Sequence, residues 1–219
     1  MLDDKTIIIT GANRALGRAA VAAASQHNAR VIEFDIAFDA DSDARYVVDL
    51  TRPEIIAGWV AEVGEIDAVL NIAGGFAMGP AVHETSDDEW QHMMTMNVVT
   101  MRNMVAAVVP KMRAAGRGSI VNVGALSAVS GQANMGAYVA AKSTVMRLTE
   151  GLAKELRNDG VNVNAVLPSI IDTPTNRADM PDADFDKWVQ PSDLAEVMCF
   201  LASDRARAVH GALLPVSGL

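Results

Sequence analysis

The feature that most constrains the fold of this chain is a regular alternation of short apolar runs with longer segments of helical periodicity. The apolar runs lie at residues 6–10, 30–34, 45–50, 67–74, 119–125, 161–168 and 212–216. Several are nearly continuous in Val, Ile, Leu and Ala, which is typical of strands buried on both faces of a parallel sheet. The helical segments lie between most of them, at about residues 15–28, 52–63, 86–115, 137–158 and 192–203. The alternation predicts a single α/β domain, residues 1–219, with a doubly wound, mostly parallel seven-stranded sheet and helices on both faces.

The connection from Asp35 to Ala44 departs from this pattern because it is acidic and barely long enough for a crossover. We expect its helix to be missing or reduced to a single turn.

Composition excludes several classes of protein. The net charge is −9, and no basic cluster is present, which argues against a nucleic-acid partner. The sequence contains no run of 18 apolar residues, so we expect no membrane span. Its charged first residues lead directly into a strand, so we expect no secretory signal. The lone Cys199 excludes an intramolecular disulfide and fits a cytoplasmic protein. The four histidines show no ligand spacing, so we expect no metal site.

The stretch "TGANRALG", residues 10–17, follows the first apolar run and opens the first helix. Gly11 and Gly17 would allow a tight turn and close approach of the backbone to a pyrophosphate. The N-terminus of the helix would supply free N–H groups for the phosphates. An ordinary strand-to-helix turn is the alternative. Ala15 stands where a middle glycine is expected, which predicts a slightly wider or shifted loop.

Asp35 ends the second apolar run at the spacing of a carboxylate that binds the adenosine ribose. That carboxylate would repel a 2′-phosphate, so it favours NAD(H) over NADP(H). Arg14 could pair with the phosphate or simply face solvent. Asp49 could accept a hydrogen bond from the adenine amino group or serve as a turn residue before "TRPE".

Tyr138 and Lys142, in "YVAAK", lie one helical turn apart. A nearby ammonium stabilises a phenolate and is expected to lower the pKa of the tyrosine from its usual value near 10. The pair could then pass a proton to or from a substrate atom.

Together these motifs resemble the short-chain dehydrogenase/reductase family along essentially the whole chain, with its Rossmann-type fold. "NIAG" is similar to its N-N-A-G stretch, "MNVV" to the segment whose asparagine anchors a proton-relay water, and "LPSIIDTP" to the segment that lines the nicotinamide. The resemblance implies that Tyr138, Lys142 and Asn97 are catalytic. It implies a cofactor site formed by Gly11, Asn13, Arg14, Leu16, Gly17, Asp35, Asp49, Leu50, Asn71, Ala73, Gly74, Tyr138, Lys142, Pro168, Ile170, Ile171 and Thr173.

Two positions depart from the family pattern: Ala125 replaces the catalytic serine, and Ser169 replaces a glycine. The dihydropteridine reductase branch shares the first departure. "GALSA", "AGGFAMG" and "LPSIIDTPTNRADMPDADFDKW" resemble that branch, as does a compact lid at about 172–190, whereas Asn97 follows the general family.

The resemblance and Ala125 predict an NAD(P)(H)-dependent oxidoreductase that transfers a hydride to a small activated quinonoid or imine-like substrate, such as quinonoid dihydropterin. A carbonyl or 3-oxoacyl reductase, or an alcohol dehydrogenase, is one alternative. A non-catalytic dinucleotide sensor is another.

The expected substrate-binding residues are Phe76, Ala125, Ser127 and Asn176. Ser127 or Ser130 could replace the missing serine, and Asn176 could instead be a turn residue of the lid. Phe76 and Trp188 could flank a planar substrate or pack the lid onto the body.

The fourth helix is rich in methionine, which usually fills irregular core space. Its methionines are Met93, Met94, Met96, Met101, Met104 and Met112. In the family the fourth and fifth helices form subunit contacts, so we expect a homodimer or homotetramer through them.

Overall fold

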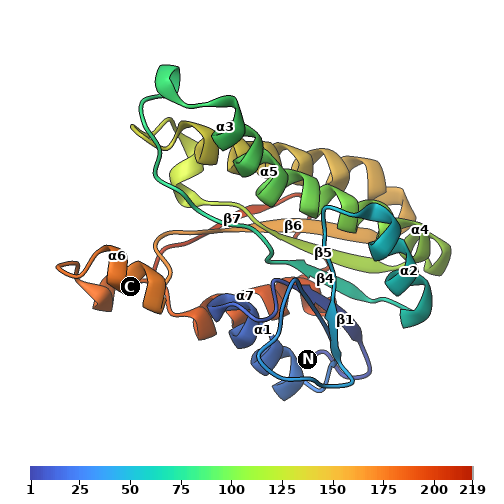
Figure 1. Ribbon diagram of the computed structural model, residues 1–219. Helices are drawn as coiled ribbons and strands as arrows, with labels where there is room; N and C mark the ends of the chain where they lie inside the picture. The colour runs from blue at the N-terminus through green and yellow to red at the C-terminus, as the bar shows by residue number, and fades with distance from the viewer. Residues whose placement is uncertain (219) are drawn as a thin grey trace.

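The computed structural model describes residues 1–218, which contain one seven-stranded sheet (Figure 1). The strand order is β3-β2-β1-β4-β5-β6-β7, and every neighbouring pair is parallel. The strands are β1 (Thr6–Thr10), β2 (Arg30–Asp35), β3 (Arg45–Val47), β4 (Ala68–Asn71), β5 (Gly118–Val123), β6 (Val161–Pro168) and β7 (Leu213–Val216). The predicted doubly wound fold is confirmed, and the strand order reverses between β1 and β4, where such folds bind their ligands.

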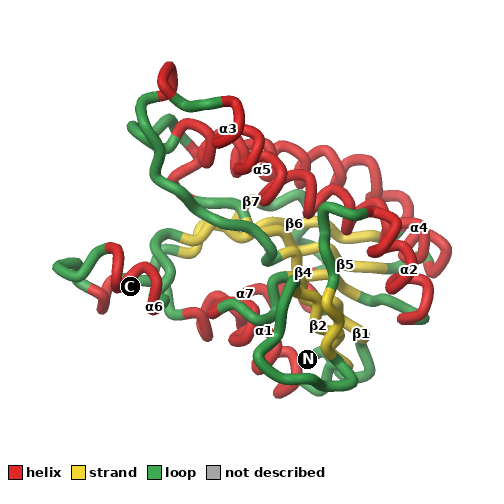
Figure 2. Tube along the Cα trace, viewed as in Figure 1, coloured by secondary structure: helices red, strands yellow, loops and turns green. Residues whose placement is uncertain are grey.

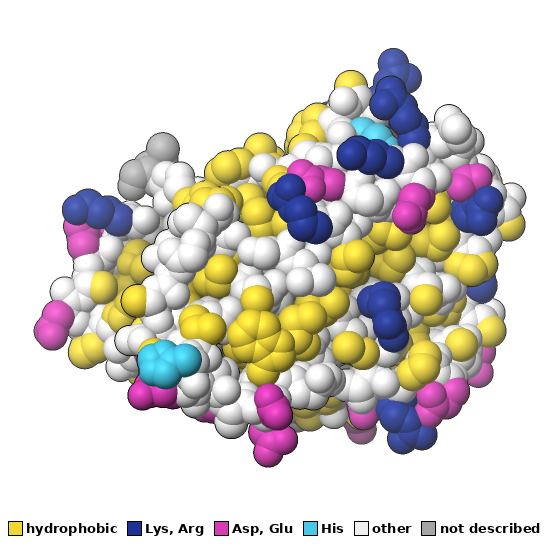
Figure 3. All heavy atoms as spheres, turned by 90° about the horizontal axis from the view of Figure 1, so that it is seen from above, with side chains coloured by type: hydrophobic (Ala, Val, Ile, Leu, Met, Phe, Trp, Pro, Cys, Tyr) yellow, Lys and Arg dark blue, Asp and Glu magenta, His cyan; other side chains and the backbone are white. Residues whose placement is uncertain are grey.

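Helices cover both faces of this sheet (Figures 1 and 2). The helices are α1 (Ala15–Gln26), α2 (Pro53–Val63), α3 (Asp87–Met94), α4 (Thr100–Ala115), α5 (Gly136–Leu156), α6 (Pro174–Asp179) and α7 (Pro191–Ala202). α1 and α7 pack on one face, whereas α2, α4 and α5 pack on the other. Seen from above in Figure 3, the outer surface near α3 and α5 carries apolar side chains among its charged ones.

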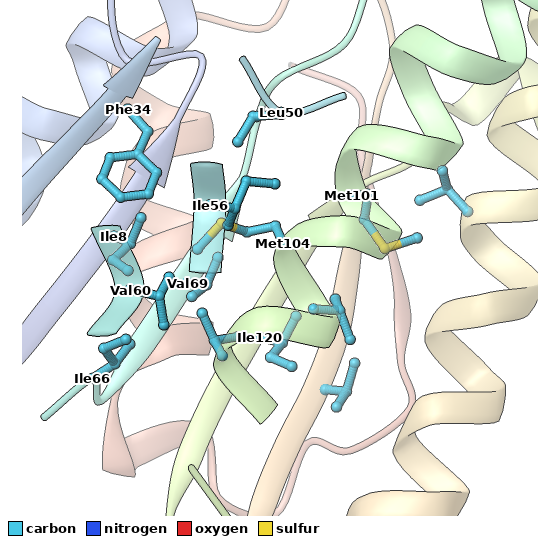
Figure 4. Close-up of a cluster of buried hydrophobic side chains, with 14 of the residues drawn as sticks. Ile8, Phe34, Leu50, Ile56, Val60, Ile66, Val69, Met101, Met104 and Ile120 are labelled. Carbon is cyan, nitrogen blue, oxygen red and sulfur yellow. The ribbon is translucent and has the colours of Figure 1, made fainter. Parts of the chain in front are cut away.

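The alternation of side chains along β1 shows why its apolar run is continuous. Ile8 joins the cluster under α2 and α4, whereas Ile7 and Ile9 join the cluster under α1 and α7. Figure 4 shows Ile8 beside Phe34 and Val69 in the first cluster. Fully burying one such side chain contributes about 1.5–3 kcal/mol, so both faces of the central strands stabilise the fold.

The methionines of the fourth helical segment mainly fill this core. Met93, Met101, Met104 and Met112 are buried, and Met94 and Met96 pack against the cluster at its edge. Cys199 is also buried, as expected of an apolar helix residue, and burial raises the pKa of its thiol to about 12.

The single helix expected at 86–115 is divided in the structure. Ser86 is the N-cap of α3, and its side chain forms a reciprocal capping box with Glu89. A π-helical turn, Thr95–Val99, then connects α3 to α4. Extra residues of this kind in a helix often lie at functional sites, and this turn contains Asn97.

Residues 36–44 contain no helix in the structure, which confirms the expectation for the short crossover. The strands β4 and β5 end at Asn71 and Val123, earlier than the apolar runs suggested. The remaining apolar residues of both runs therefore form loops at the carboxyl edge of the sheet, where the predicted site residues lie.

Candidate active site

Thr10, the last residue of β1, ties the glycine-rich loop to the loop that follows β4. Its hydroxyl accepts hydrogen bonds from the N–H groups of Ile72 and Ala73, both at 3.1 Å, and donates to Leu70 O at 3.4 Å. The sequence interpretation assigned Thr10 no function of its own, although its place directly before Gly11 was a usable signal. The threonine therefore sets the spacing of two loops that contain predicted cofactor-binding residues.

The glycine-rich loop is so close to its neighbours that two of its positions require glycine. Gly11 has a φ of +67°, and a Cβ there would lie 2.9 Å from Ala73 N. A Cβ at Gly17 would lie 2.1 Å from Gly11 O. Ala15 is exposed at the first position of α1, so its methyl group meets no such restriction.

The N-terminus of α1 fits a pyrophosphate. Arg14 is the N-cap residue, its side chain makes no capping hydrogen bond, and the first turn of the helix contains no acidic residue. The backbone N–H groups of this turn therefore remain available to an anion.

Asp35 is held at the end of β2 by backbone donors. Its Oδ2 accepts from Asn13 N at 2.8 Å, and its Oδ1 accepts from Ile36 N at 2.7 Å. The side chain of Asn13 donates to Ala37 O at 3.1 Å. Each carboxylate oxygen keeps a second lone pair, so the carboxylate can still accept from a ribose hydroxyl.

Asp49 forms the turn that the sequence offered as the alternative to adenine binding. Its Oδ1 accepts from the backbone N–H of Thr51 at 2.9 Å and from the Thr51 hydroxyl at 2.7 Å. These hydrogen bonds lower the pKa of the Asp49 carboxyl. Leu50 is buried, and its carbonyl accepts from Asn103 Nδ2 at 3.0 Å. A contact of either residue with adenine stays a prediction.

Asn97 is buried in the π-helical turn and holds the loop after β4. Its Oδ1 accepts from Gly75 N, and its Nδ2 donates to Gly75 O and Met93 O, all at 3.1 Å. A Cβ at Gly74 would lie 2.7 Å from Asn97 Oδ1 and 3.4 Å from Lys142 Nζ. The predicted residues Asn97, Gly74 and Lys142 are therefore brought together.

Lys142 is buried in α5, and its Nζ donates to Val123 O at 2.9 Å. Burial lowers the pKa of Lys142 from 10.5 to about 8, because the protein replaces water around the ammonium.

Tyr138 differs from the expectation of a lowered pKa. Burial raises its pKa from 10.0 to about 12. The ring packs edge-on against Phe76, with the ring centroids 4.9 Å apart, and it also lies against the apolar cluster that contains Ala125. Burial disfavours the charged phenolate in this arrangement, so Tyr138 is a neutral phenol at neutral pH.

Ala125 lies where the family's serine is expected. It is 4% exposed and belongs to a cluster with Ala128, Met146 and Leu167, against which Tyr138 packs. Ser127 is half-buried in the 3-10 turn Leu126–Val129 that follows. A contact of Ser127 with substrate stays a prediction.

The segment after β6 forms the other wall of the predicted nicotinamide site. Pro168 ends β6, Ile170 is 41% exposed, and Ile171 pairs with Val189. Thr173 caps α6 by accepting from Asn176 N at 3.1 Å. The side chain of Asn176, in the first turn of α6, donates to Ile171 O at 2.8 Å, which fits the lid role that the sequence offered as the alternative. A contact of Asn176 with substrate stays a prediction.

The lid also shows what Trp188 does. Trp188 is 7% exposed and packs against Phe185, with the ring centroids 4.8 Å apart. Arg177 lies over the Phe185 ring and pairs with Asp172 through two hydrogen bonds. The packing alternative therefore accounts for Trp188, whereas Phe76 lies on Tyr138 instead.

Asn71 connects the ends of β4 and β5 in the interior. Its Nδ2 donates to Asn122 Oδ1 at 2.8 Å, and Asn122 Nδ2 donates to Thr149 Oγ1 at 2.9 Å. The Oδ1 of Asn71 is buried and lacks a partner within residues 1–218. These hydrogen bonds join β4, β5 and α5, the helix that carries Lys142.

A cavity of about 70 Å³ adjoins Tyr138 and is lined by residues 77–80, Thr85, Glu89, His92, Met93 and 135–138. A larger one, of about 340 Å³, opens at the amino edge of the sheet among Lys5, Arg117, Arg157 and Arg207. Only the first adjoins the predicted catalytic residues.

In the described part of the chain, no three His, Cys, Asp or Glu side chains gather in a way that could hold a metal ion. No helix among those residues is long and apolar enough to cross a membrane.

The doubly wound sheet, the glycine-rich turn and the Tyr–Lys pair define the class of nicotinamide-dinucleotide oxidoreductases. The family model described as enoyl-(acyl carrier protein) reductase matches residues 3–218. The chain belongs to the short-chain dehydrogenase/reductase family and is an NAD(P)-dependent oxidoreductase.

Individual relatives cover nearly the whole chain. The cis-4-hydroxycyclohexanecarboxylate dehydrogenase of Sinomonas cyclohexanicum is 30% identical, covering 98% of this chain and 96% of its own. Carveol dehydrogenase from Mycobacterium avium, solved with NAD, has a TM-score of 0.87 at 28% identity, covering 98% of this chain and 96% of its own. A structure described as an NAD(P)-dependent gluconate 5-dehydrogenase from Beutenbergia cavernae, with bound NADP, has a TM-score of 0.88 at 29% identity, covering 99% of this chain and 96% of its own.

Proposed function

We propose that this enzyme is an NAD(H)-preferring reductase of small activated electrophiles, of a quinonoid or imine-like kind, with quinonoid dihydropterin as the leading test compound. The observation that carries the proposal is Ala125. The position beside Tyr138 holds a buried methyl group where the family's serine would polarise a carbonyl oxygen. A substrate that is already electron-poor needs less of this help.

The proposed chemistry assigns each residue a separate task. A bound nicotinamide would supply the hydride. Tyr138, kept neutral by burial, donates a proton from Oη to the substrate atom that gains charge. Lys142 would contact the nicotinamide ribose and place positive charge near the phenol. Asn97 would hold the relay water that returns a proton to Tyr138, and it fixes the Gly74–Gly75 backbone beside them.

The carboxylate of Asp35 supports the preference for NAD(H). Asp35 is ordered by two backbone donors at the position that would meet a ribose 2′-hydroxyl. A 2′-phosphate there would face like charge.

The test is NADH oxidation at 340 nm across quinonoid dihydropterin, simple quinones, diketones and simple ketones. We expect the fastest turnover with quinonoid dihydropterin and loss of that turnover in Tyr138→Phe. Faster turnover of simple ketones would overturn the substrate proposal while leaving the enzyme class intact. If none of these compounds is reduced although NADH still binds, the result would favour a dinucleotide sensor.

A carbonyl reductase or alcohol dehydrogenase is the second candidate. The name of the Sinomonas relative supports it, because that protein acts on a cyclic secondary alcohol. The half-buried Ser127, two residues beyond Ala125, could supply the hydroxyl if the substrate reaches it. Oxidation of alicyclic alcohols with NAD⁺ tests this candidate directly.

We also propose that the enzyme is a homodimer or homotetramer through α4 and α5. Trp90 of α3 and Leu148 of α5 are exposed large apolar side chains, and α3 packs against α5. Figure 3 shows apolar side chains among the charged ones on the surface near these helices. Light scattering of wild type and Leu148→Glu would test the interface. A monomeric wild type, or an unchanged mass in the variant, would contradict it.

A further inference from the structure

The loop at residues 36–44, which replaces the missing crossover helix, folds back onto the start of α1. Its Asp39 pairs with Arg18 of α1, with Oδ2 2.5 Å from Nη2. The side chain of Arg18 also holds Asn13, through Nε to Asn13 O at 2.9 Å and Nη2 to Asn13 Oδ1 at 3.0 Å. Asn13 is the residue whose N–H binds Asp35. Arg18 and the ribose-binding carboxylate are therefore joined through one residue.

Arg45 anchors the other side of this loop. Its guanidinium lies over the Phe38 ring, 5.6 Å from the centroid, and donates to Ala40 O at 3.0 Å. Asp39 thus lies between two anchored residues. The backbone of the loop therefore helps to place Asp39 beside Arg18, in addition to the attraction between their charges.

We propose that Asp39 is a specificity-determining residue that strengthens the NAD(H) preference by occupying Arg18. A guanidinium beside the ribose site is a strong ligand for a 2′-phosphate, because it donates paired hydrogen bonds. Here Nη2 of Arg18 donates to both Asp39 Oδ2 and Asn13 Oδ1, and Nε donates to Asn13 O. A 2′-phosphate would meet two carboxylates, Asp35 and Asp39, and an Arg18 whose charge is already paired. The inference rests on the proposed dinucleotide site and goes beyond Asp35 alone.

The pair can be removed without damaging the fold. The side chains of Arg18 and Asp39 are 60% and 76% exposed, and exposed ion pairs contribute little to stability. Asp41 and Asp43 are exposed in the same loop, so Asp41→Asn and Asp43→Asn are matched controls that change the net charge by the same amount.

The experiment measures the dissociation constants of NADH and NADPH by fluorescence titration at one fixed ionic strength. In Asp39→Asn we expect the NADPH-to-NADH ratio of dissociation constants to fall about tenfold, which is the effect of one freed charge-assisted hydrogen bond. Asp41→Asn and Asp43→Asn should leave the ratio near that of wild type. Equal ratios in all three variants would overturn the inference.

The double variant Arg18→Gln/Asp39→Asn separates the freed arginine from the lost repulsion. If Arg18 binds the phosphate in Asp39→Asn, the double variant should return the ratio most of the way to wild type. The same tenfold fall in the double variant would overturn the assignment to Arg18. A wild type that binds neither nucleotide would instead refute the proposed dinucleotide function, which makes the two failures distinguishable.

Discussion

Asn97 forms two hydrogen bonds with the backbone of Gly75: its Oδ1 accepts from Gly75 N and its Nδ2 donates to Gly75 O, each at 3.1 Å. This relationship fixes the distance between the π-helical turn and the loop after β4. Since Gly74 lies against both Asn97 and Lys142, these hydrogen bonds also position the loop backbone relative to Lys142, the predicted catalytic lysine.

The variant Asn97→Ala should therefore lose stability and activity together. Leaving Gly75 N unpaired should lower the free energy of unfolding by about 1–3 kcal/mol, and the displaced loop should reduce kcat about 100-fold. Urea unfolding and steady-state kinetics measure both quantities. Asn164→Ala is the control, because Asn164 is also buried, donates to Val209 O and accepts from Ala212 N, all outside the predicted site. Equal losses of kcat in both variants would contradict a positioning role.

Gly17 and Ala15 of the glycine-rich loop should differ in their sensitivity to substitution. Gly17→Ala should destabilise the protein by about 1–3 kcal/mol and weaken NADH binding, because its Cβ would lie 2.1 Å from Gly11 O. Ala15→Gly should leave NADH binding within about threefold of wild type, an effect under 1 kcal/mol. Titration with NADH measures the dissociation constant of each variant. Much tighter binding by Ala15→Gly would show that the methyl group obstructs the pyrophosphate.

The free energy of unfolding should depend on the protonation of Lys142 at alkaline pH. Its pKa is about 8 in the folded protein and 10.5 in the unfolded chain, so between these values the unfolded state binds more protons. The contribution of Lys142 to the free energy of unfolding should rise through this window by about 3 kcal/mol. Tyr138 has the opposite sign, because its pKa rises from 10.0 to about 12 on folding, so its contribution falls as pH rises from 10 to 12.

Urea unfolding of wild type, Lys142→Met and Lys154→Met from pH 7.5 to 10 measures the contribution of Lys142 to the free energy of unfolding. The wild type should gain stability relative to Lys142→Met as pH rises, whereas Lys154→Met, which changes an exposed lysine of the same helix, should follow the wild type. Parallel curves for wild type and Lys142→Met would show that the lysine is not desolvated.

Restoring a hydroxyl at position 125 should change substrate choice. Ala125→Ser would place a donor beside Tyr138 and should raise kcat/KM for simple ketones about tenfold or more, as expected of a donor to a developing oxyanion. Ala128→Ser, in the same buried cluster, controls for the cost of a buried hydroxyl. No gain over Ala128→Ser would mean that the missing serine does not limit ketone reduction.

Ser127 can be assessed separately by Ser127→Ala. If Ser127 replaces the missing serine, turnover of the best substrate should fall by about 10–100-fold with little change in stability. Unchanged kcat and KM would remove Ser127 from the mechanism.

The sequence by itself determined the layered fold and supplied the residues of the predicted site. Continuous apolar runs such as residues 6–10, alternating with periodic segments, indicate strands buried in a parallel sheet with helices on both faces. Gly11, Asp35, Asn97, Tyr138 and Lys142 were predicted because each follows a recognisable element or motif. Asp49, Asn176 and Trp188 each had two interpretations, since a side chain that caps a turn or packs a lid has the same local sequence as one that binds a ligand.

Only the tertiary structure decided relationships that depend on residues far apart in the chain. The π-helical turn at Asn97 arises where the α3–α4 segment must meet Gly75. The raised pKa of Tyr138 arises from burial against Phe76 and the Ala125 cluster, which overrides the simple expectation from a lysine one turn away. The pairing of Arg18 with Asp39 depends on the course of a loop without regular structure. Periodicity reports which face of an element is buried, whereas desolvation and loop contacts depend on what the rest of the chain brings to that face.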